Sequence, residues 1–597
     1  IAQTTRAEGV TRIALVSDDI AKFAAADFPT GTTFHDRADL DAVQRELREV
    51  KGVSVLIYEQ TCATEKRRRR KRGTLPDPAR FAMINDLVCE GCGDCSVESN
   101  CLSVEPRETP LGRKRRINQS SCNKDFSCVN GFCPSFVTVH GATRRKGRAT
   151  VDRATLEDGL PLPAPADLAQ PFELLVAGVG GTGVVTVGAL ITMAAHLEGK
   201  GASVLDFTGF AQKFGTVLSY IRLGASPQAL NQVRIGTRAA DAVIGCDIVV
   251  SSSPKASMHY RPGTRMVLNR AEMPTGDIVL NRDASLSVAR REKLIAGTIG
   301  AENLMASDAN ALAETLLGDA VFANVILLGQ AWQAGLVPVT LDAMERAIEL
   351  NGVSIEANRT AFALGRCLHA APERLTLPDA APAEETLDQM IDRRAAHLTD
   401  YQGSDLAARY CARLDQLRSA LPFASEALMR SVARNLFRFL SPKDEYEVAR
   451  LMTSDHFRDE IAQTFEGDYT ISYHMAPPLL PLGQDGRGRP KKRSFGGWMT
   501  PVLTVLARMK GLRGTWADPF GYSGEARLHR DILRWYDALL DQAMAEGTPE
   551  SEDTWITRLA AADEIRGYGP VREEAARKAI GVTDSEKVDG ALGVPAE

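Results

Sequence analysis

The stretch Cys89-Glu90-Gly91-Cys92-Gly93-Asp94-Cys95 places three cysteines at Cys-x2-Cys-x2-Cys spacing. Cys101 follows, and a second run contains Cys122, Cys128 and Cys133, the last directly before Pro134. Seven of the eleven cysteines therefore lie between Cys89 and Cys133. In a large chain without secretory features, clustered thiols indicate metal or redox chemistry rather than structural disulfides.

The first run is typical of a ferredoxin-like iron–sulfur module. Three closely spaced thiolates can converge from one loop, and a distant Cys-Pro supplies the fourth ligand in bacterial-type sites. The spacing therefore predicts one [4Fe-4S] cluster. Its expected ligands are Cys89, Cys92, Cys95 and Cys133.

The second run departs from this pattern because Asp125 stands where the middle cysteine is expected. A carboxylate is a harder ligand than a thiolate and holds iron less tightly. A second [4Fe-4S] cluster therefore stays open; its ligands would be Cys101, Cys122, Asp125 and Cys128. The alternative is a zinc ribbon built from two Cys-x2-Cys pairs, although the three-cysteine run and the Cys-Pro step favour iron and sulfide.

A glycine-rich turn lies downstream, between a predicted strand and a predicted helix. Helix N-terminal amides favour an anion, so its glycines are candidate cofactor-binding residues: Gly178, Gly180, Gly181 and Gly183. Asp206 follows near the end of the next strand, where an acid binds ribose in dinucleotide sites. An NAD(P)-linked iron–sulfur oxidoreductase is therefore one alternative, and a purely structural role of the glycines is another.

The pattern around these motifs predicts a multidomain α/β protein. Residues 1–80 indicate the end of an α/β domain, 85–140 the cysteine module, 172–370 a Rossmann-like α/β domain, and 388–580 a mainly helical domain. Pro-rich linkers are predicted at 149–171 and 371–387. Predicted strands are Arg12–Val16, Val53–Tyr58, Glu173–Ala177, Ser203–Phe207, Val217–Leu223, Asp247–Ser251 and Arg265–Leu268. Predicted helices include Ala38–Val50, Gly183–Leu197, Phe322–Ala334 and Leu341–Leu350, the last capped by Thr340.

Composition gives no reason to expect a membrane or nucleic-acid partner. Of the 597 residues, 44% are hydrophobic and 25% charged, with a net charge of −5, as in soluble globular proteins. The apolar stretch Leu174–Leu197 is long enough for a bilayer, but its glycines favour a buried strand–turn–helix. We expect a cytoplasmic protein and, by default, a symmetric oligomer. The first residue, Ile1, suggests part of a longer polypeptide.

Basic residues gather near the cysteines in three runs. The runs are Lys66–Arg72, Arg113–Arg116, and Arg144, Arg145, Lys146 and Arg148. They are either solvated loops or a positive surface for an acidic partner. In the C-terminal region, we expect His474 to be structural and Lys491–Arg493 to be a solvated loop, with contact to a phosphate as the alternative for this triplet. Helical spacing allows ion pairs from Lys443 to Glu447 and from Glu447 to Arg450.

The combination of these motifs resembles the fused indolepyruvate (2-oxoacid) ferredoxin oxidoreductases. Phe214 stands where that family usually has glycine. The matching stretches are VAGVGGTGVVTVGALI (Val176–Ile191), AQKFGTVLSYIR (Ala211–Arg222), NVILLGQAWQAGLVPV (Asn324–Val339), SPKDEYEVARL (Ser441–Leu451), FEGDYTISYHMAPPLL (Phe465–Leu480) and LRGTWADPFGY (Leu512–Tyr522).

The resemblance implies oxidative decarboxylation of a 2-oxoacid, with coenzyme A accepting the acyl group and ferredoxin the electrons. It implies that residues 1–80 end a thiamine-diphosphate-binding domain and that 172–370 form a gamma-type domain. This chain contains no Gly-Asp-Gly motif followed by Asn. Thiamine diphosphate and Mg²⁺ are therefore expected mainly outside it, on the N-terminal half of the same enzyme. The chain itself would relay electrons through [4Fe-4S].

Overall fold

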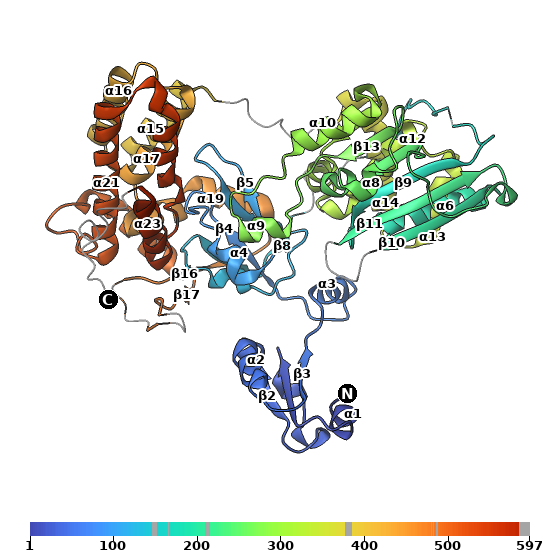
Figure 1. The fold of residues 1–597 in the computed structure, drawn as a ribbon, viewed down its shortest axis with the longest axis horizontal. Coiled ribbons are helices and arrows are strands. Elements are labelled where there is room, and N and C mark those ends of the chain that lie inside the picture. Colours follow the sequence, from blue (N-terminus) through green and yellow to red (C-terminus); the bar gives the residue numbers. More distant parts are fainter. Residues whose placement is uncertain are drawn as a thin grey trace. The chain divides into compact units, whose positions relative to one another are not determined.

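The computed structural model describes residues 1–145, 152–164, 166–208, 215–375, 385–478, 480, 483–484 and 488–583. Lys146, Arg148 and the stretch 211–214 lie outside these residues, as do parts of both predicted linkers. The chain divides into two compact units, the N-terminal unit (1–77) and the main unit (78–597), which run from blue to red in Figure 1.

The N-terminal unit contains a parallel three-stranded sheet of order β2-β1-β3. Ala14 and Val16 of the central strand pack against Val43 and Leu47 of a helix, while Ile13 faces the opposite side. This strand–helix–strand order confirms the sequence prediction. Its elements are α1 (Ala2–Ala7), β1 (Arg12–Ser17), β2 (Thr33–Asp36), α2 (Leu40–Arg48), β3 (Ser54–Glu59) and α3 (Ala63–Lys71).

The glycine-loop domain, within residues 172–370, is built on a six-stranded sheet of order β10-β11-β9-β12-β13-β14. β11 runs antiparallel to both of its neighbours, whereas β9, β12, β13 and β14 are parallel to one another. The strands are β9 (Phe172–Val179), β10 (Gly201–Thr208), β11 (Thr216–Gly224), β12 (Ala242–Gly245), β13 (Arg265–Asn269) and β14 (Leu304–Ser307).

Helices cover both faces of this sheet (Figure 1). Leu174 and Val176 of β9 point to one apolar layer, and Leu175 and Ala177 point to the other, as the period of two in a strand requires. The first layer contains α6 (Val184–Leu197), α11 (Ala309–Leu312), α12 (Ala323–Gln333), α13 (Leu341–Asn351) and α14 (Ile355–Ala370). The second contains α7 (Ile248–Ser251), α8 (Pro254–Ser257) and α10 (Val288–Ile299). The Thr340 hydroxyl caps α13, as predicted.

The predicted strand Asp247–Ser251 is wrong, because these residues form α7 and the strand lies earlier, at β12. The Asp247 carboxylate accepts a hydrogen bond from the Val250 N–H at 2.7 Å. This N-cap starts a helical turn and overrides the β propensity of the following Ile-Val-Val.

The cysteine module and the C-terminal region share one antiparallel sheet of order β17-β16-β7-β4. Met83 and Val137 of the module share a core with Phe457 and Tyr473. Residues 388–580 are therefore not purely helical: they supply two strands beside the cysteines. The strands are β4 (Arg80–Ile84), β7 (Phe136–His140), β16 (Thr470–Met475) and β17 (Arg493–Phe495), with the smaller pairs β5 (Val104–Arg107) and β6 (Lys114–Ile117), and β8 (Thr143–Arg144) and β15 (Phe465–Glu466).

The remaining C-terminal elements of the described chain are nine helices. The first three and the last three surround a core that includes Tyr410, Leu436 and Tyr536, and the middle three pack on the core that Met83 shares with Phe457. They are α15 (Leu387–Tyr401), α16 (Ser404–Ala420), α17 (Glu426–Leu440), α18 (Glu445–Met452), α19 (Asp455–Thr464), α20 (Met499–Arg508), α21 (Gly524–Glu546), α22 (Glu552–Ala560) and α23 (Gly569–Thr583). Three short helices lie elsewhere: α4 (Asp94–Ser99), α5 (Arg153–Glu157) and α9 (Gly276–Leu280). No helix in the described part of the chain is long and apolar enough to cross a membrane.

Candidate metal centre

The first cysteine loop follows β4 and ends at the start of α4. Gly91 and Gly93 both have left-handed backbone, with φ of +67° and +83°. At Gly91 a Cβ would stand 2.3 Å from the Arg113 carbonyl oxygen, so no larger residue fits. The Gly91 N–H donates a hydrogen bond to Cys89 Sγ at 3.3 Å.

The second loop, from Cys122 to Cys128, repeats this conformation. Lys124 and Phe126 are left-handed, with φ of +53° and +64°, at the positions of Gly91 and Gly93. The Lys124 N–H donates to Cys122 Sγ at 3.4 Å, as the Gly91 N–H does to Cys89. Asp125 thus occupies the place that Cys92 holds in the first loop.

The electrostatic interactions of the thiols divide the candidate ligands into two sets. Burial raises the pKa of Cys95, and Cys133, Cys92 and Cys89 raise it further, with a smaller contribution from Cys128. Burial likewise raises the pKa of Cys128, followed by Cys122, Cys101 and Asp125. We call these sets the first quartet (Cys89, Cys92, Cys95, Cys133) and the second quartet (Cys101, Cys122, Asp125, Cys128).

The quartets differ in burial. Cys89 and Cys95 of the first are buried, and a Cβ on the adjacent Gly131 would stand 2.9 Å from the Cys95 Cα. In the second, Asp125 is exposed and its carboxylate accepts hydrogen bonds from the Ser127 backbone and hydroxyl. The second quartet is therefore the more accessible of the two.

The spacing of the thiols is too wide for a single zinc ion. Tetrahedral zinc with Zn–S bonds of about 2.3 Å holds its sulfurs about 3.8 Å apart. All eleven cysteines are described and all are free thiols. Among the described residues, no three cysteine sulfurs lie within 4.8 Å of one another. A cluster in which each thiolate binds a different iron does not require sulfurs this close.

The residues that do approach so closely are Asp86, His456 and Glu460. Arg107 pairs with both carboxylates, so a cation already lies between them. No spacing in the sequence indicated these residues.

The surroundings of Arg115 indicate independently whether an anionic cluster would fit beside the first quartet. It is 1% exposed, and its Nε and Nη1 find no hydrogen-bond partner among the described residues. Burial lowers the pKa of Arg115, and Cys95 and Cys89 raise it. A buried guanidinium with unsatisfied donors is costly, and an anionic group beside Cys89 and Cys95 would satisfy it.

Two lysines from the C-terminal region also reach the module. Lys492 Nζ donates to the carbonyls of Val129 and Gly131, at 2.8 and 2.7 Å, in the segment that joins Cys128 to Cys133. Burial lowers the pKa of Lys492, and Cys133 raises it. The prediction of a solvated loop is therefore wrong for Lys492.

Lys443 pairs with Glu90 at 2.6 Å and donates to the Cys89 carbonyl at 3.1 Å. The predicted pair of Lys443 with Glu447 is therefore wrong, whereas Glu447 does pair with Arg450 at 2.7 Å. Burial acts to raise the pKa of Glu90, but Lys443 and Lys114 outweigh it and hold that pKa well below its usual range. The sequence missed these residues because no local spacing connects them to the cysteines.

The docking interpretation of Arg113–Arg116 is also wrong. Lys114 and Arg115 are buried, while Arg113 pairs with Glu108 and Arg116 with Glu105. The first basic run lies in α3 of the N-terminal unit, where Arg68 and Arg69 pair with Glu65. Of the third run, Arg144 donates to the Ser120 hydroxyl.

The glycine loop lies at the N-terminus of α6. Gly178 is required for packing, because a Cβ there would stand 2.7 Å from Val184 and 2.8 Å from Cys246. The Gly180 N–H donates to the Gly215 carbonyl. Gly181 and Gly183 are left-handed, with φ of +85° and +101°. Contact of this loop with a ligand stays a prediction.

The position of Asp206 disfavours a dinucleotide site. In such folds the strand after the first helix lies beside the first strand. Here β11 separates β10 from β9, so Asp206 lies two strands away, about 10 Å. Its carboxylate accepts a hydrogen bond from the Ser219 hydroxyl.

Two protein families match this chain. The family described as pyruvate ferredoxin/flavodoxin oxidoreductase matches residues 173–368, and a family of unknown function, DUF6537, matches 387–584. The indolepyruvate oxidoreductase subunit IorB of Thermococcus kodakarensis is 26% identical over 214 residues, covering 35% of this chain and 100% of the relative. The IorB subunit of Pyrococcus horikoshii is 25% identical over 221 residues, with the same coverage.

Solved structures match at lower identity. The pyruvate oxidoreductase subunit PORC of Thermotoga maritima is 19% identical, covering 33% of this chain and 96% of its own, with a TM-score of 0.25. The gamma subunit of a keto/oxoacid ferredoxin oxidoreductase from Geobacter sulfurreducens is 20% identical, covering 34% and 99%, with the same score. Scores this low carry no structural conclusion. The domain match and the two IorB relatives concern the same part of the chain: residues 173–368 match the pyruvate ferredoxin/flavodoxin oxidoreductase family, and the chain is similar over about a third of its length to indolepyruvate oxidoreductase subunits.

Proposed function

We propose that this chain is the electron-relay part of a 2-oxoacid ferredoxin oxidoreductase that acts on arylpyruvates such as indolepyruvate. One observation supports this most strongly: two quartets of candidate ligands lie on loops of matching conformation, in the same main unit as the family's domain. The substrate class rests on the IorB relatives. Coenzyme A would accept the acyl group and ferredoxin the electrons.

The first quartet would hold one [4Fe-4S] cluster, and the second would hold another with Asp125 as its fourth ligand. Such clusters, when bound, accept and release single electrons at potentials set by charge, hydrogen bonding and exposure. The chain's residues would control all three factors. The amides of Gly91 and Lys124 donate to ligand sulfurs, and Arg115 and Lys492 place positive charge beside the first quartet.

The other cofactors lie mainly outside this chain in the proposal. Thiamine diphosphate and Mg²⁺ would bind on the N-terminal half of the enzyme, because the chain lacks their sequence motif. Coenzyme A would contact the glycine loop at Gly181, which is exposed and has no described residue within 4 Å of an added Cβ. An NAD(P) site has weaker support because Asp206 lies two strands from β9.

The test is EPR of the full enzyme, including its thiamine-binding half, frozen anaerobically after mixing with a 2-oxoacid and coenzyme A. We expect reduced [4Fe-4S] signals with indolepyruvate and phenylpyruvate, and slower reduction with pyruvate or 2-oxoglutarate. Cys133→Ser should remove the signal of the first quartet and leave that of the second. Reduction by NADPH but by no 2-oxoacid would contradict the proposal.

A further inference from the structure

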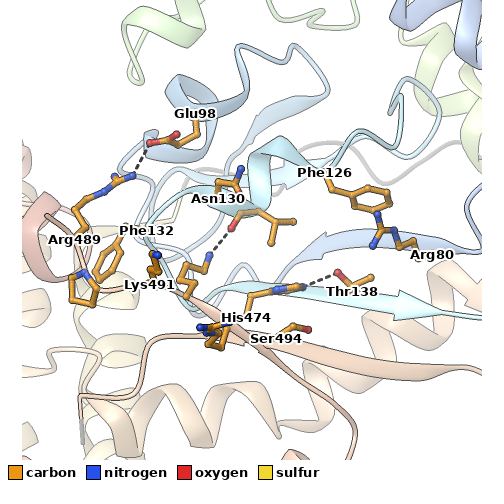
Figure 2. Close-up of a pocket in the computed structure, with 14 residues that line it drawn as sticks. Arg80, Glu98, Phe126, Asn130, Phe132, Thr138, His474, Arg489, Lys491 and Ser494 are labelled. Carbon is orange, nitrogen blue, oxygen red and sulfur yellow. Dashed lines mark hydrogen bonds and ion pairs between the residues drawn. The ribbon is translucent and has the colours of Figure 1, made fainter. Parts of the chain in front are cut away.

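A basic pocket of about 710 Å³ opens between the ligand loops and the strands from the C-terminal region. Figure 2 shows its lining, with Phe126, Asn130 and Phe132 from the cysteine module and His474, Lys491 and Ser494 from the C-terminal region. Five of its lining residues are Arg or Lys and only one is acidic: Arg80, Arg489, Lys491, Lys492, Arg493 and Glu98.

Several of these cations have no carboxylate partner. Arg489 pairs with Glu98 at 2.9 Å and with Asp94 at 3.5 Å. By contrast, Lys491 and Arg493 are exposed and make no ion pair with any described residue. The pocket is therefore positively charged beyond what its own acid neutralises.

Of two further groups in the lining, Arg80 adds to the positive charge and His474 does not. Arg80 lies 4.1 Å above the Phe126 ring and also lacks an ion pair within the described residues (Figure 2). His474 donates to, or accepts from, the Thr138 hydroxyl at 2.7 Å. Burial, and then Lys492, His140 and Arg80, lower the pKa of His474 to about 4. His474 is therefore neutral at pH 7 and adds no charge of its own.

The wall of the pocket is made by the ligand loops themselves. Phe126 directly follows Asp125, Val129 directly follows Cys128, and Phe132 directly precedes Cys133. Asp125 is exposed on this more accessible second quartet. A molecule held at the pocket would therefore contact residues bonded directly to candidate ligands of both quartets.

We propose that this pocket and its rim, Arg80, Lys491 and Arg493, form the docking site for an acidic electron-carrier protein. The proposal rests on the proposed function. It places the docking surface in the C-terminal region rather than at the Arg113–Arg116 run. A protein surface fits better than a small phosphate compound because the unpaired cations line an open rim on several elements. Complementary charge of this kind steers association and weakens with salt.

The test is the Kd of an acidic ferredoxin for the full chain, measured anaerobically by biolayer interferometry. The Lys491→Glu/Arg493→Glu variant should raise the Kd at least about tenfold at about 50 mM salt, and the difference should shrink at about 500 mM. The matched control is Arg290→Glu/Lys293→Glu, on exposed residues of α10 that also lack ion pairs with described residues. This control should bind ferredoxin as the unmodified chain does.

Iron content and the EPR spectrum of the dithionite-reduced protein distinguish failure of the proposed function from failure of the docking proposal. A chain without iron would overturn the proposed function itself. Normal cluster signals with an unchanged Kd in the Lys491/Arg493 variant would overturn the docking site alone. Direct binding of coenzyme A to the chain that is lost in the Lys491/Arg493 variant, while the Kd of ferredoxin is unchanged in that variant, would assign the pocket to a phosphate compound and overturn protein docking.

Discussion

The loops Cys89–Cys95 and Cys122–Cys128 have left-handed backbone at equivalent positions but different residues there. Both place left-handed residues at their third and fifth positions, glycines in the first and Lys124 and Phe126 in the second. A non-glycine residue in this conformation costs about 1 kcal/mol or more. The second loop therefore adopts a conformation that its own residues disfavour. We infer that the convergence of its ligands maintains that conformation.

The surroundings of the two quartets differ as well. The first has two buried thiols, Cys89 and Cys95, and the cations Arg115 and Lys492 beside it. The second exposes Asp125. This difference suggests that the two sites have different tasks, with the first shielded inside the protein and the second facing a partner.

Gly91→Ala should have the largest effect, because its Cβ would meet the Arg113 carbonyl at 2.3 Å. We expect loss of the cluster of the first quartet, about four irons per chain, measured by iron and acid-labile sulfide analysis. Gly112→Ala is the matched control, because Gly112 is also left-handed, at φ +94°, but has open space around it. Equal iron content in both variants would show that the tight loop is not needed for the cluster.

Asp125→Ala should remove the second cluster only, lowering the iron content from about eight to about four per chain while the first EPR signal persists. Asp125→Cys should retain both clusters and slow iron release to a chelator, because thiolate binds iron more tightly than carboxylate. Full iron content in Asp125→Ala would exclude Asp125 as a ligand.

Lys443→Met should destabilise the first loop selectively by about 3 kcal/mol, because it leaves Glu90 buried without its closest cation. We expect faster iron loss from the first quartet on mild heating, followed by EPR. The double variant Lys443→Met/Glu90→Gln should recover much of the loss. If the double variant lost iron as fast as Lys443→Met does, the destabilisation would come from other contacts of Lys443 and not from the unpaired Glu90.

Lys492→Met should have the smallest effect, a lower midpoint potential for the first cluster by about 60 mV, which corresponds to about 1.4 kcal/mol for one electron. Removing a buried positive charge disfavours the more negative reduced state. Lys492→Arg keeps the charge, and Lys491→Met changes only an exposed neighbour, so both should leave the potential nearly unchanged in EPR-monitored redox titrations. An unaltered potential in Lys492→Met would restrict this residue to a structural role.

Local patterns predicted much of the fold and the grouping of the cysteines by loop. Strand periodicity located β1, β3, β9, β10, β11 and β13, and the strand–glycine–helix pattern located α6. The error at Asp247 arose because one side-chain cap outweighed three β-branched residues. Because the two loops have the same length, their spacing also predicted that Asp125 occupies the position in the second loop that Cys92 occupies in the first.

Long-range contacts could not be predicted from local patterns. Lys492 and Lys443 reach the module from more than 350 positions away in the chain, and β16 and β17 complete its sheet from the same region. The burial of Arg115 depends on Arg282 of the glycine-loop domain, whose carbonyl accepts its remaining hydrogen bond. No periodicity or spacing in the sequence connects these segments.

The central claim is that two loops of one conformation hold two clusters, one of them with a carboxylate ligand. Anaerobic iron and acid-labile sulfide analysis of the intact chain, with EPR of the dithionite-reduced protein, tests it most directly. We expect about eight irons and eight sulfides with coupled [4Fe-4S] signals. About four irons would contradict the second cluster, and zinc without sulfide would contradict the redox function altogether.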